Sequence, residues 1–262
     1  MDLSVVIWTN IGLALATTLV GYLFGSIPTS LMVGKLFFKK DPRDYGSHNL
    51  GATNTGRVLG KKIGLIVIFL DALKLVIPLW GFWAIITFTS ISDISISPIF
   101  TEPFRVSLGA FTPSQEIVQY YYLVALGCSI GHCFPLFAGL KGGKSVACLA
   151  GFMFFSNWMF TIVLIIIFFI VLCSKKYVSL ASICAATVAA LISWLSLIPQ
   201  LSTLAFWGNG QAFVGGVEFA SIVTLISFIV ILRHRGNIKR LLNGDERKIT
   251  WLDRKKKETA AE

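Results

Sequence analysis

The chain has 262 residues, of which 55% are hydrophobic and 14% are charged, and its mean hydropathy is +0.76. This composition leaves too little polar surface for a water-soluble globule and therefore excludes the soluble fold classes. The formal net charge of +10 suits contact with anionic headgroups or with phosphate-bearing ligands. A lipid-exposed backbone must satisfy its own hydrogen bonds, so we predict an all-α fold, a polytopic integral membrane helical bundle.

Apolar runs of roughly 20 residues, which cross about 30 Å of hydrocarbon, predict the membrane spans. The stretch 145–173 is too long for one crossing, and Ser156-Asn157 offers turn chemistry near its middle, so we interpret it as a hairpin. Gly25, Pro28 and Gly34 interrupt the segment 25–38, which we interpret as interfacial or re-entrant. The predicted spans, seven in all, lie at about 4–24, 63–87, 118–138, 145–156, 158–173, 179–198 and 216–232.

The distribution of basic residues predicts the orientation of these spans. All Lys and Arg except Lys74 and Arg105 fall in or beside four segments, namely 35–62, 141–144, 175–176 and 233–257. The positive-inside rule places these segments in the cytoplasm and the charge-poor loops 89–115 and 202–216 outside. We therefore expect an outside N-terminus, a cytoplasmic C-terminus, and a single transmembrane domain over 1–262 with a basic cytoplasmic tail from about 247.

Polar, glycine-rich sequence is concentrated in three segments, all on the predicted cytoplasmic face: Gly46–Arg57, Gly131–Lys144 and Arg233–Glu246. Glycines let backbone N–H groups approach an anion, while Arg, Lys, Ser, Thr and Asn supply charge and further donors. This composition favours a phosphate site. Anionic lipid headgroups are the alternative ligand, and they better suit the basic residues without interleaved glycine: Lys39, Lys40, Lys61, Lys62 and the run 254–257.

Two other phosphate or acyl-transfer motifs are excluded. Gly143-Lys144-Ser145 resembles the end of a Walker A loop, but Ala138 stands where that loop needs glycine and an apolar helix precedes it. The three histidines do not begin a His-x4-Asp pair. A transporter, channel or flippase for phosphate-bearing molecules is the rival class, although the polar motifs gather on one face and no inverted repeat is visible.

Charged and sulfur-bearing side chains also occur inside the apolar runs. Asp71 and Lys74 lie three residues apart in one predicted span, so they can share a helix face, either as a structural ion pair or to orient the polar site. The five cysteines lack CxxC spacing, and we interpret them as small core residues.

Further motifs occur in a fixed order along the chain: Gly25-Ser-Ile-Pro28, Gly-Ser-x-Asn-x-Gly-Ala-Thr-Asn-x-x-Arg at 46–57, Gly131-His-x-Phe-Pro135 followed by Lys141-Gly-Gly-Lys144, and Arg233-His-Arg-x-Asn237. Together they closely resemble the acyl-phosphate-dependent glycerol-3-phosphate acyltransferases of bacteria, the PlsY family. The resemblance covers nearly the whole chain, and Asp71-x-x-Lys74 and Tyr177–Ser182 also look like family elements.

The resemblance implies transfer of the acyl group of fatty acyl phosphate to the primary hydroxyl of sn-glycerol 3-phosphate, which gives lysophosphatidic acid and phosphate in the first step of phospholipid synthesis. It implies a multi-pass protein of the bacterial cell membrane with its site on the cytoplasmic side. It also implies contact with membrane lipids and no need for a cofactor, a metal, acyl-CoA, acyl carrier protein or nucleic acid. The protein partners that it suggests are an acyltransferase that forms acyl phosphate and another that uses the product.

The resemblance also implies the site residues. Those expected to be catalytic are Ser47, Arg57, Lys144, Ser179, His234 and Asn237. Those expected to bind substrate are Asn49, Thr53, Asn54, Lys141, Gly142, Gly143 and Ser182. Two alternatives remain open: the asparagines and Thr53 bind glycerol 3-phosphate or hold the loop, and the serines act in the site or pack in the membrane.

The general base is the least defined part of the implied mechanism. His234 has a suitable intrinsic pKa, but Arg233 and Arg235 flank it and disfavour its protonation. We therefore expect His234 to hydrogen-bond and a phosphate oxygen to act as base. The chain departs from the family where glycine usually follows Ser47, here His48, and where Gly-Val-Ala-Thr usually follows the second lysine, here Ser145–Cys148.

Overall fold

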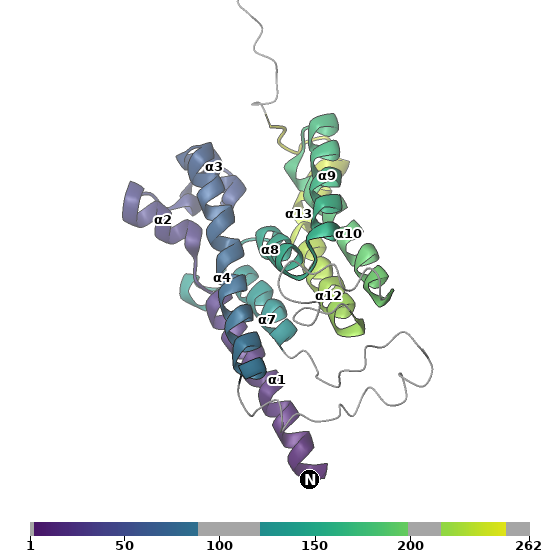
Figure 1. The fold of residues 1–262 in the computed structure, drawn as a ribbon. Helices are drawn as coiled ribbons and strands as arrows, with labels where there is room; N and C mark the ends of the chain where they lie inside the picture. Colours follow the sequence, from purple (N-terminus) through teal and green to yellow (C-terminus); the bar gives the residue numbers. More distant parts are fainter. Residues whose placement is uncertain (1–2, 89–120, 199–215, 250–262) are drawn as a thin grey trace, which may run out of the picture.

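The computed structural model describes residues 3–88, 121–198 and 216–249, and within these ranges every regular element is helical (Figure 1). The α-helices are α1 (Leu3–Gly25), α2 (Thr29–Phe38), α3 (Ala52–Leu59), α4 (Lys61–Phe88), α7 (Tyr121–Cys133), α8 (Val146–Ser156), α9 (Trp158–Lys175), α10 (Val178–Ile192), α12 (Val217–Arg233) and α13 (Arg235–Leu242). The 3-10 turns are η1 (Pro42–Asp44), η3 (Leu136–Ala138) and η4 (Ser193–Leu197). The predicted outside loops and residues 118–120 fall outside the described ranges, as does the tail from 250.

The apolar helices confirm a helical membrane fold. Stretches long and apolar enough to cross a bilayer number four in the described part, namely Ile11–Phe38, Lys61–Ile85, Trp158–Lys175 and Val178–Leu197. The pair α12 and α13, bent by 54°, gives a fifth if it is taken as one span. Helices α7 and α8 are apolar but shorter, and each predicted span overlaps one of these helices.

Local chemistry explains two helix breaks. Helix α8 ends at Ser156, and the Oδ1 of buried Asn157 accepts a hydrogen bond from Phe160 N (3.0 Å), which caps α9. The predicted helix break at Ser156-Asn157 is thereby confirmed. At the other break, α1 ends at Gly25 and Pro28 precedes α2, so the segment 25–38 forms a turn and a separate short helix.

Helices α1 and α7 pack backbone against backbone. A Cβ atom added at any of four glycines would lie 2.1–2.2 Å from a carbonyl oxygen of the other helix. These glycines are Gly21 and Gly25 in α1 and Gly127 and Gly131 in α7. Small residues allow this close approach of membrane helices. The packing of α1 against α7 therefore places the turn after α1 next to the loop after α7.

The core joins α7, α8 and α12. The rings of Tyr122, Phe152 and Phe219 lie 5.6–5.8 Å apart between centroids, and all three side chains are fully buried. A thiol adds a polar contact, because Cys128 Sγ donates to Lys74 O (3.7 Å), the carbonyl that Pro78 cannot bond within α4. Figure 1 shows α2 and α3 beside one end of α4, with α9, α10, α12 and α13 grouped together.

Candidate active site

The second and third glycine-rich segments meet where α12 ends. Arg233 Nε donates to Gly143 O (3.2 Å) and its Nη2 donates to Gly142 O (3.3 Å). Its guanidinium also lies 5.0 Å from the centroid of the Phe134 ring. Gly143 N donates in turn to His132 O (3.0 Å). The Lys141–Lys144 loop is therefore held between α7 and α12.

The Glu246 carboxylate connects three of the predicted site residues, two directly and one through Asn237. Its side chain is only 6% exposed, and its Oε1 accepts hydrogen bonds from Ser179 Oγ (2.8 Å) and Asn237 Nδ2 (2.7 Å). Its Oε2 pairs with Arg240 Nε (2.7 Å). The Oδ1 of Asn237 accepts from Lys144 Nζ. Ser179, Asn237 and Lys144, which come from distant parts of the sequence, thus form one cluster.

Sequence reasoning did not assign a role to Glu246. The available signal was a single acidic pair, Asp245-Glu246, within a segment that is otherwise strongly basic. Only the fold shows that the second member of this pair turns back toward α13 and also meets Ser179 of α10, which lies 67 residues earlier in the chain.

Positive charge is concentrated around Lys144. Burial lowers the pKa of Lys144 to about 8; the nearby guanidinium groups of Arg240, Arg233 and Arg57 lower it further, while Glu246 opposes them. Burial also lowers the pKa of Arg57, with Arg247 as its strongest charged neighbour. Like charges held this close favour an anionic ligand, which would raise both pKa values again.

His234 is buried at the junction of α12 and α13. Its Nδ1 donates to Val230 O (2.7 Å), which leaves Nε2 as a hydrogen-bond acceptor. Burial lowers the pKa of His234 to about 4, and Lys144 acts in the same direction. The imidazole is therefore neutral near pH 7, which fits the expected hydrogen-bonding role better than that of a strong base.

Asn54 holds the loop of the first segment. Its Oδ1 accepts from Ser47 N (2.7 Å). Its Nδ2 donates to the carbonyl oxygens of Pro42 (2.7 Å), Tyr45 (3.2 Å) and Asn49 (3.1 Å). Of the two roles left open for Asn54, the contacts support loop holding. Ser47 and Asn49 are half-buried in the same loop.

Two of the three departures from the expected motifs lie at left-handed backbone positions, whereas Cys148 lies within α8. His48 has φ 55° and Ser145 has φ 61°. Glycine adopts this region without steric cost, which fits the glycine that the resemblance leads us to expect at these two positions. His48 lies on the surface, with Nδ1 2.7 Å from Arg43 O, so it does not enter the site.

The remaining predicted residues lie at the edge of this cluster or outside it. Lys141 and Thr53 are exposed, and Arg57 projects from α3 within electrostatic range of Lys144. Ser182 Oγ donates to Val178 O (2.9 Å), which supports the packing interpretation for this serine. Gly142 and Gly143 are buried, and a Cβ on either would lie 2.1 Å from an atom of His132.

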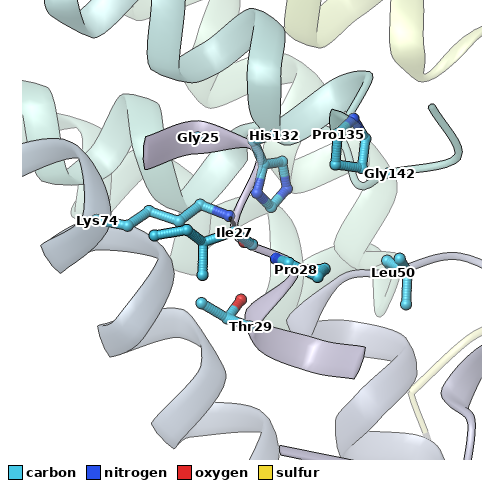
Figure 2. Close-up of a pocket in the computed structure, with 9 residues that line it drawn as sticks. All are labelled: Gly25, Ile27, Pro28, Thr29, Leu50, Lys74, His132, Pro135 and Gly142. Carbon is cyan, nitrogen blue, oxygen red and sulfur yellow. Dashed lines mark hydrogen bonds between the residues drawn. The ribbon is translucent and has the colours of Figure 1, made fainter. Parts of the chain in front are cut away.

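The intramembrane ion pair of α4, Asp71 and Lys74, lies close to His132 of the second segment. Asp71 Oδ1 lies 2.8 Å from Lys74 Nζ and accepts from Thr29 Oγ1 (2.6 Å), and Lys74 also donates to Ile27 O (3.0 Å). His132 Nδ1 lies 3.4 Å from the same carboxylate oxygen. Figure 2 shows Lys74 and His132 directed toward the turn between α1 and α2. The ion pair is confirmed, and through His132 it supports the Gly142–Gly143 backbone.

The chain has clear relatives among known proteins. The sequence profile of the family described as "Glycerol-3-phosphate acyltransferase" matches residues 15–244. Proteins named glycerol-3-phosphate acyltransferase include one from Listeria monocytogenes serotype 4a (strain HCC23), 36% identical over 235 residues, which cover 90% of this chain and 96% of that protein. Another, from Staphylococcus haemolyticus (strain JCSC1435), is 37% identical over 238 residues, which cover 89% of this chain and 96% of that protein.

Solved structures of similar fold indicate the same family. The fold is similar to crystal structures of PlsY (YgiH), an integral membrane glycerol 3-phosphate acyltransferase, at 30% sequence identity. The TM-score is 0.66 for the glycerol 3-phosphate form, with 91% of this chain and 96% of that chain covered. It is 0.64 for the lysophosphatidic acid form, with 90% and 95% covered. The profile match over most of the chain, the identity to curated relatives and this structural similarity establish that the chain is an enzyme of the glycerol-3-phosphate acyltransferase family.

Proposed function

We propose that the chain transfers the acyl group of fatty acyl phosphate to the primary hydroxyl of sn-glycerol 3-phosphate. The products are lysophosphatidic acid and inorganic phosphate. The observation that carries this proposal is the cluster formed by Lys144, Ser179 and Asn237 on Glu246, surrounded by arginines and with neutral His234 beside it. Two anionic substrates must approach each other in this reaction, and concentrated positive charge offsets their repulsion.

Positioning supplies most of the catalysis in this proposal. Acyl phosphate is a mixed anhydride, so its phosphate is already a good leaving group. Arg57 and the Lys141–Lys144 loop hold one phosphate, while Asn237 and the first segment hold the other. This arrangement aligns the acceptor hydroxyl with the acyl carbonyl carbon.

The proposed step balances without a cofactor. The hydroxyl oxygen attacks the carbonyl carbon, and the bond from that carbon to the phosphate oxygen breaks. The hydroxyl proton passes to a phosphate oxygen, so the leaving group departs as hydrogen phosphate. His234 Nε2 accepts a hydrogen bond from the other hydroxyl of glycerol 3-phosphate and so orients the acceptor, which agrees with the low pKa of this residue (about 4).

We further propose seven spans with an outside N-terminus in a bacterial cell membrane, and a single domain over 1–262 with a basic cytoplasmic tail from about 247. The positive-inside rule then places all three polar segments on the cytoplasmic side, where soluble glycerol 3-phosphate is available. Enzymes that form acyl phosphate and that consume lysophosphatidic acid are the proposed partners. The profile match over residues 15–244 favours this enzyme over the rival transporter or flippase.

Release of inorganic phosphate tests the proposal. The purified protein in lipid receives palmitoyl phosphate with and without glycerol 3-phosphate, and palmitoyl-CoA serves as the control donor. We expect release that requires glycerol 3-phosphate, yields lysophosphatidic acid and does not occur with the thioester. Folded protein that transfers no acyl group from either donor would contradict the proposal and favour transport of phosphate-bearing molecules.

A further inference from the structure

A basic cleft lies next to Arg57. Its volume is about 290 Å³. Three of its lining residues carry a positive charge and none carries a negative charge. The lining residues are Lys40, Tyr45, Gly46, Arg57, Val58 and Arg247. Neither Lys40 nor Arg247 belongs to the motifs that carry the family resemblance.

The walls of this cleft come from distant parts of the sequence that are held together by direct bonds. Arg247 Nη1 donates to Gly46 O (3.4 Å), which joins the segment after α13 to the loop before α3. Gly46 has φ 67°, and a Cβ there would lie 2.3 Å from Asn54 Oδ1, so the loop that Asn54 holds requires glycine at this point. Lys40 follows α2, whose left-handed cap at Lys39 ends the helix. The cleft is therefore a built feature of the fold.

Among the described residues, no carboxylate lines the cleft to neutralise these charges. Burial lowers the pKa of Arg57, and Arg247 is close enough for its guanidinium to act in the same direction. The nearest carboxylate of the third segment, on Glu246, is already bonded to Ser179, Asn237 and Arg240. Three cations around one cleft are stabilised when an anion with several acceptor oxygens enters.

We propose that Lys40, Arg57 and Arg247 form a phosphate monoester subsite that adjoins the catalytic cluster and shares Arg57 with it. This inference rests on the proposed function, because both the acceptor, glycerol 3-phosphate, and the product, lysophosphatidic acid, are phosphate monoesters. The subsite therefore receives either the soluble substrate before reaction or the lipid product after it.

One feature beside the cleft favours the lipid product. Leu36 and Phe37, near the end of α2, are 70% and 76% exposed, and Phe38 is also exposed. This apolar surface directly precedes Lys39 and Lys40, so a lipid phosphate in the cleft would have its acyl chain beside α2. The lipid interface would then begin where the basic cleft ends.

Equilibrium binding separates the two sources. The protein is placed in nanodiscs of phosphatidylcholine, so that no anionic lipid competes, and binding of radiolabelled glycerol 3-phosphate and of lysophosphatidic acid is measured without a donor. Lys40→Gln and Arg247→Gln should each weaken binding of one ligand by about tenfold, since each removes a hydrogen bond to a charged group. Arg247→Lys, which keeps the charge, should recover part of the loss. The adjacent exposed residues provide matched controls, Lys39→Gln and Lys248→Gln.

The binding results either identify the ligand of the cleft or overturn the proposal. Loss of affinity for glycerol 3-phosphate assigns the cleft to the entering substrate, and loss for lysophosphatidic acid assigns it to the product. Cleft variants that bind both ligands like the wild type overturn the proposal, and so do equal losses in the Lys39 and Lys248 controls, because general surface charge would then explain them. Thermal unfolding confirms that each variant is folded. Binding is measured without turnover, so failure of the subsite is distinguishable from failure of acyl transfer.

Discussion

Lys144 is the residue whose charge depends most directly on the surrounding cluster. Burial and three neighbouring guanidinium groups lower its pKa to about 8, so its positive charge is lost within the range of ordinary assays. The unfolded chain would keep this proton up to the usual value of 10.5. From pH 8 to 10.5 the folded state therefore binds fewer protons than the unfolded state, and this lysine contributes stability that rises with pH.

Activity should show the opposite dependence on pH at Lys144. We expect kcat/KM for glycerol 3-phosphate to fall above pH 8, because neutral Lys144 no longer attracts phosphate. Lys144→Arg keeps its charge at these pH values, so the alkaline fall should move upward even if overall activity is lower. Steady-state rates from pH 6 to 10 check this. An identical alkaline limb in both proteins would assign it to another group.

His234 should contribute less than a general base would. With a pKa of about 4 it accepts a hydrogen bond but takes up a proton poorly at neutral pH. We expect His234→Ala to lower kcat by about tenfold, the effect of one lost hydrogen bond to a charged or reacting group. A loss of 1,000-fold or more would indicate that it is the base, and an unchanged kcat would exclude any essential role.

Ser145 is strained as well as unsatisfied. It has φ 61°, and its buried Oγ has no hydrogen-bond partner among the residues that the structure describes. Ser145→Gly relieves both costs and should raise the free energy of unfolding by about 1–2 kcal/mol. Ser145→Ala is the control, because it removes the hydroxyl but keeps a Cβ in the left-handed region, so its gain should be smaller. Thermal or denaturant unfolding in matched lipid measures the difference.

At the scale of elements, the Asp71 carboxylate connects α4 to the break between α1 and α2. Thr29, Lys74 and His132 all lie within 3.4 Å of its Oδ1. Because the pair is buried, removing one partner leaves an unpaired charge, whereas replacing both partners by apolar residues does not. The pair thus couples the position of α2 to that of the loop after α7.

A double-substitution test follows from this geometry. Asp71→Leu alone should destabilise the protein by about 3 kcal/mol or more, whereas Asp71→Leu combined with Lys74→Met should recover much of that loss. Unfolding in lipid measures the stability of each variant and of Lys74→Met alone. If the two losses simply add, the pair does not act as a unit.

Much of the helical architecture could be predicted because local sequence features, namely apolar runs and the turn residues between them, indicate the helices. The hairpin follows from Ser156-Asn157, and the spacing of Asp71 and Lys74 places them on one face. The separate helix α2 was less accessible, since its existence depends on where Pro28 stops α1. Site residues came from motifs, but the role of Glu246 depends on α10 and α13 lying side by side, which no local pattern encodes.

At the scale of the molecule, the polar segments come together although they are separated along the chain by apolar helices. Arg233 binds the Gly142–Gly143 backbone, so the third segment contacts the second, and Arg247, which directly follows the third segment, binds Gly46 of the first. The apolar helices between these segments return the chain to the same end of the molecule. The proposed orientation places this end in the cytoplasm.

Cysteine labelling tests that orientation. In a background without the native cysteines, Arg235→Cys should react with a membrane-impermeant maleimide in inverted vesicles but not in intact spheroplasts. A cysteine added at the N-terminus should show the reverse pattern. Labelling of both positions from the same side would contradict an odd number of spans and require a different assignment of α7 or α8.

The position of Glu246 after the last described helix has a consequence for biosynthesis. Its carboxylate joins Ser179 to Asn237 and, through Asn237, to Lys144. The ribosome therefore translates every apolar helix described here before it reaches the residue on which this cluster forms. A nascent chain arrested just before this codon would contain the described membrane helices but lack the carboxylate that joins Ser179 to Asn237.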